Sequence, residues 1–216
     1  MKIAVNHIPL TTPLGRRQGV VIAPTTITIH NTGNASSTAK NEREWLTNPG
    51  NSRQASFHIG VDDNQAIECI PLNEKALHSG TREGNYTSIS VEICESGNYE
   101  KALDNAAVVV AGLLKERGWG IDRLRRHYDW SGKICPRLMY DGGSWKGWEV
   151  FKELVRTKLG GEEIEYMLKK EDAEKIIKNF LQPEFADAKR KGDERGAAEA
   201  HRLANELRKA AGQKLI

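Results

Sequence analysis

The stretch HYDWSGKICP, residues 127–136, concentrates side chains that can do chemistry. His127 lies eight positions before Cys135, and a glycine between them lets the chain loop back so that both side chains can meet at one ion. His30, which follows a run of β-branched and apolar residues, offers a third ligand. Two imidazoles and one thiolate make a three-ligand zinc site with an open position for water, the arrangement of a hydrolytic zinc.

The same residues also suit a cysteine hydrolase that uses no metal. Cys135 would be the nucleophile, His127 its base and Asp129 the group that orients the base. Lys133 would then lower the pKa of the thiol. A third interpretation makes Cys135 a small buried residue and His127 a surface group. Residue types alone do not decide among the three.

Two expected strands would position other reactive groups. Residues 21–32 are β-branched and apolar, which predicts a strand that ends near His30. Residues 88–96 alternate, which predicts a strand with one apolar face and with Glu92 on the opposite, polar face. The apolar face carries Ile89, Val91 and Ile93.

The remaining pattern up to residue 158 alternates between helices and strands. Residues 56–63 and 65–72 flank an Asp-Asn turn and predict a hairpin. Residues 123–129 suggest a short strand. Helices are expected over residues 38–48, 98–118 and 144–159, the last capped by Ser144. This order predicts an α/β fold, a central mixed β-sheet flanked by helices, over residues 1–158.

The composition changes after Gly160-Gly161, and residues 159–165 read as a linker. Residues 166–216 are rich in Ala, Lys, Glu and Arg and show helical periodicity, which predicts a small helical bundle. We expect Pro183 to separate its first helix from a middle one, and Gly192 or Gly196 to precede the last. About fifty residues are marginal for independent stability, so we expect this part to dock on the main domain or to dimerise.

Composition limits the class of protein. The 216 residues are 38% hydrophobic and 28% charged, which indicates a soluble globular protein. The sequence has no apolar run long enough to span a membrane and no secretory signal pattern at its N-terminus. Three cysteines, Cys69, Cys94 and Cys135, argue against a disulfide scaffold. The net charge of +3 fits either an ordinary solvated surface or attraction to a polyanion such as a cell wall.

Four blocks in this order resemble the zinc-dependent N-acetylmuramoyl-L-alanine amidases, the type-2 family that shares its fold with peptidoglycan recognition proteins. The blocks are TTITIHNTGN, SFHIGVDD with AIECIPLNEKALHSG, SISVEICES, and HYDWSGKICP. The resemblance covers about residues 1–158 and is strongest to phage endolysins and prophage autolysins of Gram-positive bacilli. It implies that residues 1–158 are a zinc amidase catalytic domain.

The resemblance also implies roles for single residues. His30, His127 and Cys135 match the zinc ligands, Glu92 matches the acidic residue that handles the proton of the water, and Lys133 matches the basic residue that steadies the oxyanion. The substrate would be peptidoglycan of the Gram-positive wall, cut between the lactyl group of N-acetylmuramic acid and L-alanine. Zinc would polarise the amide and acidify the water, consistent with these residue types.

Other expectations follow from the same resemblance. His78 matches a position that lines the substrate groove. Residues 166–216 would bind the cell wall or form a homodimer, and neither a nucleic-acid partner nor membrane insertion is expected. Lack of a signal fits a phage endolysin that waits in the host cytoplasm until it is released to the wall. Two rivals stay open: a non-catalytic peptidoglycan-binding module, and the metal-free hydrolase of Cys135 and His127.

Overall fold

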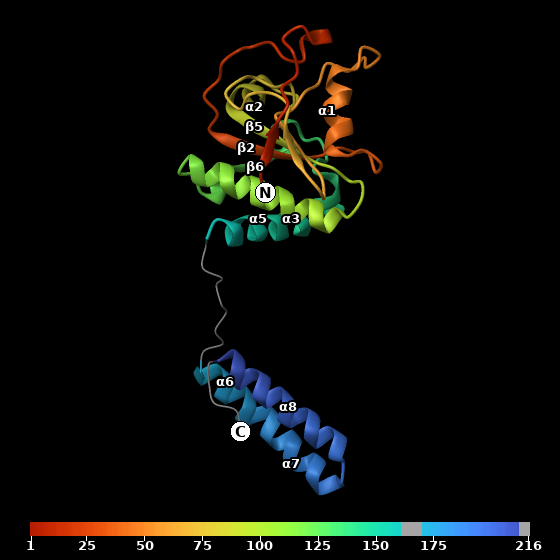
Figure 1. Ribbon diagram of the computed structural model, residues 1–216. Coiled ribbons are helices and arrows are strands. Elements are labelled where there is room, and N and C mark those ends of the chain that lie inside the picture. Colours follow the sequence, from red (N-terminus) through yellow and green to blue (C-terminus); the bar gives the residue numbers. More distant parts are fainter. Residues whose placement is uncertain (161–169, 212–216) are drawn as a thin grey trace. The chain divides into compact units, whose positions relative to one another are not determined.

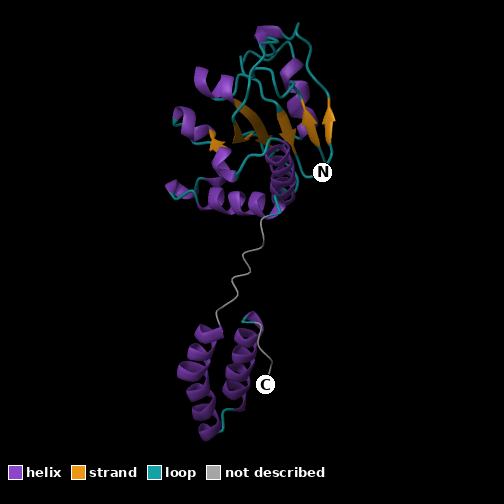
Figure 2. Ribbon diagram, turned by 90° about the vertical axis from the view of Figure 1, so that its left-hand side faces the viewer, coloured by secondary structure: helices purple, strands orange, loops and turns teal. Residues whose placement is uncertain are grey.

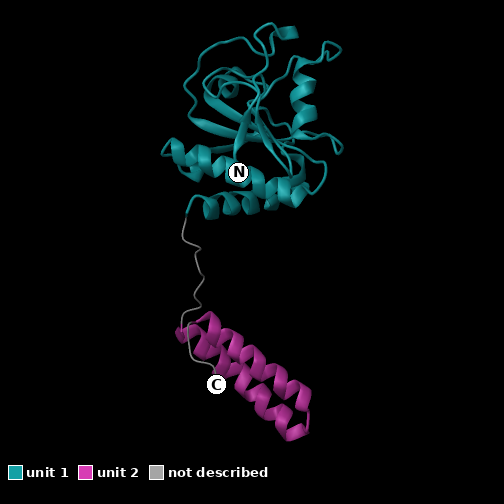
Figure 3. Cartoon of the chain, in the orientation of Figure 1, with its two compact units in different colours: residues 1–161 teal, residues 162–216 magenta. Residues whose placement is uncertain are grey.

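The chain divides into two compact units, Met1–Gly161 and Glu162–Ile216 (Figure 3). The computed structural model describes residues 1–160 and 170–211. Most of the expected linker, residues 159–165, lies outside the described residues, as do residues 166–169. Among the helices within the described ranges, none combines the length and apolar character that a bilayer-crossing segment requires.

The first unit contains a mixed sheet, as the sequence pattern predicts. Its strands occur in the spatial order β1-β4-β3-β5-β2-β6. They are β1 Ile3–Val5, β2 Thr26–Asn31, β3 Ile59–Val61, β4 Ala66–Glu68, β5 Ser88–Ile93 and β6 Leu124–Arg126. The expected hairpin is the antiparallel pair β3 and β4, and the other neighbouring strands are parallel. Figure 2 shows the strands side by side, with helices on both sides of the sheet.

Helices cover both faces of this sheet (Figure 1). In the first unit they are α1 Ala39–Thr47, α2 Arg82–Thr87, α3 Tyr99–Glu116, α4 His127–Ser131 and α5 Lys146–Lys158. One apolar core joins α3 and α5 to the sheet face that carries Ile29, Ile59 and Val91. A second core joins α1 to the opposite side through Leu46 and Phe57. Burial of such a face against helices is what makes the sheet stable.

The alternation predicted for β5 is confirmed. Ile89, Val91 and Ile93 all belong to the core formed with α3 and α5. The opposite face of β5 and of its neighbour β2 is polar but still buried, with residues such as Thr28, which is fully buried. That face carries Thr28, His30, Ser88, Ser90 and Glu92. Because polar side chains are buried there, they must find partners among themselves.

One local expectation in this unit is wrong, and a second is met only in part. Ser144 does not cap α5; the Asp141 carboxylate does so, accepting a hydrogen bond from the Gly147 N–H at 2.6 Å, while the Ser144 hydroxyl donates to the Asp141 carbonyl. The strand expected over residues 123–129 stops at Arg126. The Asp129 carboxylate accepts the Arg126 N–H at 2.7 Å, which starts a helix at the next residue.

The second unit is a pair of antiparallel helical arms. The first arm runs without a break through α6 Lys170–Ile176, a π-helical turn at Ile177–Leu181 and α7 Gln182–Lys191; the second is α8 Glu194–Ala210. Pro183 therefore does not separate two helices. It follows the wide π turn, which shifts the hydrogen-bond pattern at the point where proline lacks an N–H. Gly192, at φ 72°, ends the first arm, as expected.

The arms pack through small residues. Their buried apolar residues are Ala173, Ile177, Ala188, Ala197, Ala200 and Ala204. The larger Phe180 is 68% exposed, and Ile176 and Leu203 are also exposed, although their spacing suggested a common apolar face. The unit thus buries little apolar area for its length and leaves large apolar side chains on its surface.

Candidate metal and catalytic site

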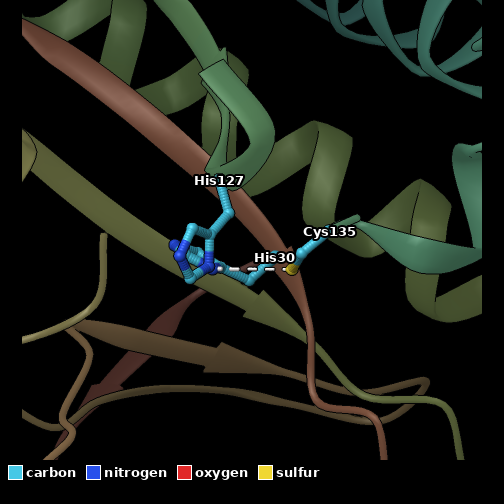
Figure 4. A group of neighbouring side chains, drawn as sticks. All are labelled: His30, His127 and Cys135. Atoms are coloured by element: carbon cyan, nitrogen blue, oxygen red, sulfur yellow. Dashed lines mark hydrogen bonds between the residues drawn. The ribbon is translucent and has the colours of Figure 1, made fainter. Parts of the chain in front are cut away.

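Three side chains that are far apart in the sequence meet at one point of the first unit (Figure 4). His30, His127 and Cys135 are buried, and their ligand atoms all lie within 4.8 Å of one another. His127 Nδ1 lies 3.1 Å from His30 Nδ1, and Cys135 Sγ lies 3.7 Å from the same His30 nitrogen. The structure thus brings together the three residues that the sequence analysis proposes as ligands.

The spacing of these atoms suits a tetrahedral metal ion. With zinc–nitrogen bonds near 2.1 Å and zinc–sulfur bonds near 2.3 Å, tetrahedral geometry separates two nitrogens by about 3.4 Å and nitrogen from sulfur by about 3.6 Å. The observed separations from His30 Nδ1, 3.1 and 3.7 Å, agree with those values. The two-imidazole, one-thiol donor set therefore fits a metal site.

The backbone explains why the ligands meet. His30 is the next-to-last residue of β2, and His127 is the first residue of α4, directly after the neighbouring strand β6. The chain then turns at Gly132, which has a φ of 73°, and returns so that the Cys135 carbonyl accepts the Tyr128 N–H at 3.1 Å. Trp130 secures α4, since its indole N–H donates to Thr28 Oγ1 at 2.9 Å.

Burial keeps both ligand histidines neutral. It is the largest cause that lowers the pKa of His127 to about 4 and the pKa of His30 well below its usual range. Neutral imidazole is the form that binds metal. Burial also raises the pKa of the Cys135 thiol to about 12, so this thiol ionises only with the help of a bound cation.

These observations count against the cysteine hydrolase. A nucleophilic cysteine needs a lowered pKa, whereas burial of Cys135 outweighs the opposing effect of Lys133. His127 Nδ1 points at His30. Asp129 does not orient His127, because its carboxylate accepts hydrogen bonds from the backbone and guanidinium of Arg126.

Glu92 lies beside the candidate metal ligands, on the strand adjacent to that of His30. His30 and Glu92 are paired in the parallel register of β2 and β5, and Glu92 Oε1 is 3.9 Å from His30 Nδ1. Within the described residues, Glu92 Oε2 is buried without a hydrogen-bond partner. Burial raises the pKa of Glu92 to about 8, and Lys133 partly opposes the shift. Such a carboxyl can exchange a proton near neutral pH.

A cavity of about 530 Å³ opens onto these groups. Among the residues that line it are all three ligands, Glu92, His78 and the exposed Lys133. Both ring nitrogens of His78 have protein partners. Its Nδ1 lies 3.1 Å from His30 Nε2, and its Nε2 lies 3.3 Å from the Ser88 carbonyl oxygen.

Another part of the rim of the cavity was not foreseen from the sequence. It includes Trp45, Arg53 and Gln54. Arg16, a fully buried residue, holds this rim by donating to the carbonyls of Leu46, Asn51 and Arg53. The role of Arg16 could not be predicted from the sequence, because a single arginine in a polar N-terminal stretch is part of no periodic pattern.

Comparison with known proteins agrees with this geometry. The profile of the N-acetylmuramoyl-L-alanine amidases matches residues 21–138. The chain is 49% identical to the amidase CwlA of Bacillus subtilis over 142 residues, 62% of this chain and 51% of CwlA. It is 46% identical to the amidase XlyB of the same organism, covering 62% of this chain and 43% of XlyB. The chain thus spans about half the length of these curated relatives.

Solved structures show the same similarity. The catalytic domain of XlyA is 34% identical with a TM-score of 0.65, covering 72% of this chain and 99% of that domain. The structure of PlyL is 38% identical with a TM-score of 0.61, covering 72% of this chain and 97% of PlyL. In both comparisons, almost the whole of the solved chain has a counterpart here.

Proposed function

The chain belongs to the family of N-acetylmuramoyl-L-alanine amidases, and from this we propose that it is a zinc-dependent hydrolase of bacterial peptidoglycan. It would cleave the amide between the lactyl group of N-acetylmuramic acid and L-alanine. The observation that carries the proposal is the convergence of His30, His127 and Cys135 beside Glu92 in the lining of one cavity.

His30, His127 and Cys135 would hold the zinc. The chemistry that zinc supplies when bound is polarisation of the amide carbonyl and acidification of a water. Glu92 would take the proton of that water and deliver it to the nitrogen of the leaving L-alanine. Its Oε2, which has no hydrogen-bond partner among the described residues, and its raised pKa support this role, because a general base works best when its pKa is near the working pH.

Lys133 would stabilise the negative charge that develops on the amide oxygen. Its side chain lines the same cavity as Glu92, and its positive charge lowers the pKa values of Glu92, His127 and Cys135, which supports this role. We expect Lys133→Ala to lower kcat more than it raises KM. A change confined to KM would contradict a role in the transition state.

The first test is the metal content of the purified chain, with wall-clearing activity measured before and after chelation. About one zinc per chain, with activity lost on chelation and restored by zinc, would support the proposal. Activity that survives complete metal removal would overturn it and return Cys135 to the role of nucleophile. Release of peptides with a free N-terminal L-alanine would exclude the rival view of a non-catalytic binding module.

The second unit would act as a wall-binding or dimerisation module. Several of its cations are paired within the unit, for example Lys189 with Glu194 and Arg202 with Glu199, which leaves less free positive charge for an anionic wall polymer. Its exposed Phe180 and Ile176 favour an apolar contact, such as a homodimer. If a chain that ends at residue 160 binds and clears walls as well as the full chain, the wall-binding role fails.

The biological setting that we propose is phage lysis. An endolysin of this kind would stay in the cytoplasm of the host bacterium until it is released to the Gram-positive wall. The relatives CwlA and XlyB, both amidases of Bacillus subtilis, support a wall of that type.

A further inference from the structure

A chain of hydrogen-bonding groups leads from the metal ligand His30 to the protein backbone. His30 Nε2 lies 3.1 Å from His78 Nδ1, and His78 Nε2 lies 3.3 Å from the carbonyl oxygen of Ser88. Both rings are buried, His30 being 2% and His78 7% exposed. The ring planes are nearly perpendicular, at 88°, so the contact joins one ring edge to the other through nitrogen.

The Ser88 carbonyl, at the end of this series of hydrogen bonds, determines which ring nitrogens of His78 and His30 carry hydrogen. A carbonyl oxygen only accepts hydrogen bonds, so His78 Nε2 must carry the hydrogen. The other nitrogen of a neutral His78, Nδ1, is then an acceptor, and His30 Nε2 must donate to it. This leaves His30 Nδ1 with a free lone pair, and that atom is the one that faces His127 and Cys135.

The alternative protonation states are unfavourable. If His78 carried its hydrogen on Nδ1, its Nε2 lone pair would face the lone pairs of the Ser88 carbonyl at 3.3 Å. A doubly protonated His78 would be a buried charge facing an imidazole and a carbonyl, and within the described part of the chain neither of its ring nitrogens has a carboxylate partner. Either state would also place a hydrogen on His30 Nδ1 and close the metal-binding side of that ring.

The position of His78 is itself fixed by the backbone around it. The side-chain oxygen of Asn85, in α2, accepts the N–H groups of both His78 and Ser79 at 2.9 Å. Ser88 is the first residue of β5, which pairs with β2 along its whole length. Both ends of the His78 ring are therefore attached to the same pair of strands that carries His30.

We propose that His78 is a positioning residue that holds His30 as the Nε2–H tautomer and thereby presents Nδ1 to the metal. This inference rests on the proposed function for its purpose, but the tautomer itself is a property of the metal-free chain. His78 acts through His30 and needs no contact with substrate. Partners of this kind commonly contribute about 10- to 100-fold to metal affinity.

The first experiment examines the unaltered full chain without metal. Long-range ¹H–¹⁵N NMR of the imidazole rings, at neutral pH, reports which nitrogen of each histidine carries hydrogen. The expected result is the Nε2–H tautomer for both His30 and His78. Finding His30 as the Nδ1–H tautomer, or either ring doubly protonated, would overturn the proposal whether or not any variant folds.

The second experiment measures zinc affinity by competition with a chromophoric chelator. His78→Leu cannot accept the hydrogen bond of His30 and is expected to bind zinc about 10- to 100-fold more weakly. His78→Gln keeps an acceptor oxygen and is expected to stay close to the parent. His201→Leu, in the second unit, controls for loss of a histidine as such.

The outcomes separate this inference from the function itself. Zinc binding by the His78→Leu protein that equals the parent's would overturn the positioning role while leaving the amidase proposal intact. Equal weakening in the Leu and Gln variants would overturn it too, because a purely structural role does not distinguish an acceptor from an apolar group. Absence of zinc binding by the parent would instead defeat the proposed function.

Discussion

Replacing Glu92 by Gln should make the metal-free protein more stable and the enzyme inactive. The pKa of Glu92 is raised from 4.5 to about 8 by burial. Below about pH 4.5 the carboxyl is protonated in both the folded and the unfolded state and has no effect. Above it the unfolded state loses its proton first, so the stability of the folded state falls as pH rises, until the fall ends near pH 8.

The size of the effect follows from the shift. The pKa of the unfolded carboxyl is 4.5, so pH 7 lies about 2.5 units above it. At about 1.36 kcal/mol per unit, keeping Glu92 buried lowers the free energy of unfolding by about 3 kcal/mol. The side chain keeps 18% of its surface exposed in the cavity, which makes this an upper value. Gln has nearly the same shape and no charge, so it should remove the penalty while leaving the three metal ligands in place.

Urea unfolding followed by tryptophan fluorescence measures this directly. All five tryptophans lie within residues 45–148, so the signal reports the first unit alone. Burial also lowers the pKa of histidines such as His30 and His127, but their pH dependence is common to both proteins. The free energy of unfolding of the parent minus that of Glu92→Gln should therefore decline from pH 5 to pH 8. Curves of the two proteins that stay parallel across this range would refute the view that burial raises the pKa of Glu92.

Two further measurements complete the test. Turnover by the zinc-loaded Glu92→Gln protein should fall about 10²- to 10⁴-fold with its zinc content unchanged. Glu95→Gln is the matched control, since it makes the same change near the same strand end. The Glu95 carboxylate accepts hydrogen bonds from Arg137 and from the Gly33 N–H, so this variant should instead lose stability.

Three other predictions concern the supports of the site and the helix ends. Trp130→Phe removes the hydrogen bond to Thr28. It should lower the free energy of unfolding by about 1–2 kcal/mol in the same assay and weaken zinc binding, because α4 is held less firmly. An unchanged free energy of unfolding together with an unchanged zinc affinity would show that the indole N–H is dispensable. Asp141→Ala should destabilise the first unit by about 1 kcal/mol, whereas Ser144→Ala should change it by less than about 0.5 kcal/mol, and the reverse order would restore Ser144 as the cap. Chelation of the zinc-loaded protein should lower the Tm of the first unit, because metal bound to the folded state alone stabilises it; an unchanged Tm would mean that the ligands do not hold zinc when folded.

The sequence was most informative where a pattern repeats. Alternation along residues 88–96 placed Glu92 on the polar face of its strand, and the apolar run before His30 located the end of the neighbouring strand. Parallel strands bring such ends together, so the meeting of these residues follows from the fold class. The convergence of Cys135 with them needed the family resemblance, because the spacing of HYDWSGKICP is not a common zinc signature.

The expectations that failed depended on contacts with residues outside the local pattern. A serine before a helix is a common cap, but here the carboxylate of Asp141, three residues before Ser144, accepts the hydrogen bond of the Gly147 N–H. Proline usually ends a helix, but a π turn before Pro183 let the helix continue. The cavity rim depends on Arg16 reaching three carbonyls between residues 46 and 53, a long-range arrangement that no local propensity contains.

The register of β2 and β5 makes His30 and Glu92 direct neighbours on adjacent parallel strands. Their separation is therefore set by the spacing of the backbone ladder, which is nearly the same in every sheet. The loop that Arg16 holds, between residues 46 and 53, belongs to neither of these two strands. In evolutionary terms, we expect the sheet to be the constant frame and the cavity loops to be the part that varies, so exchanging the loop at residues 46–53 should leave the separation of His30 and Glu92 unchanged.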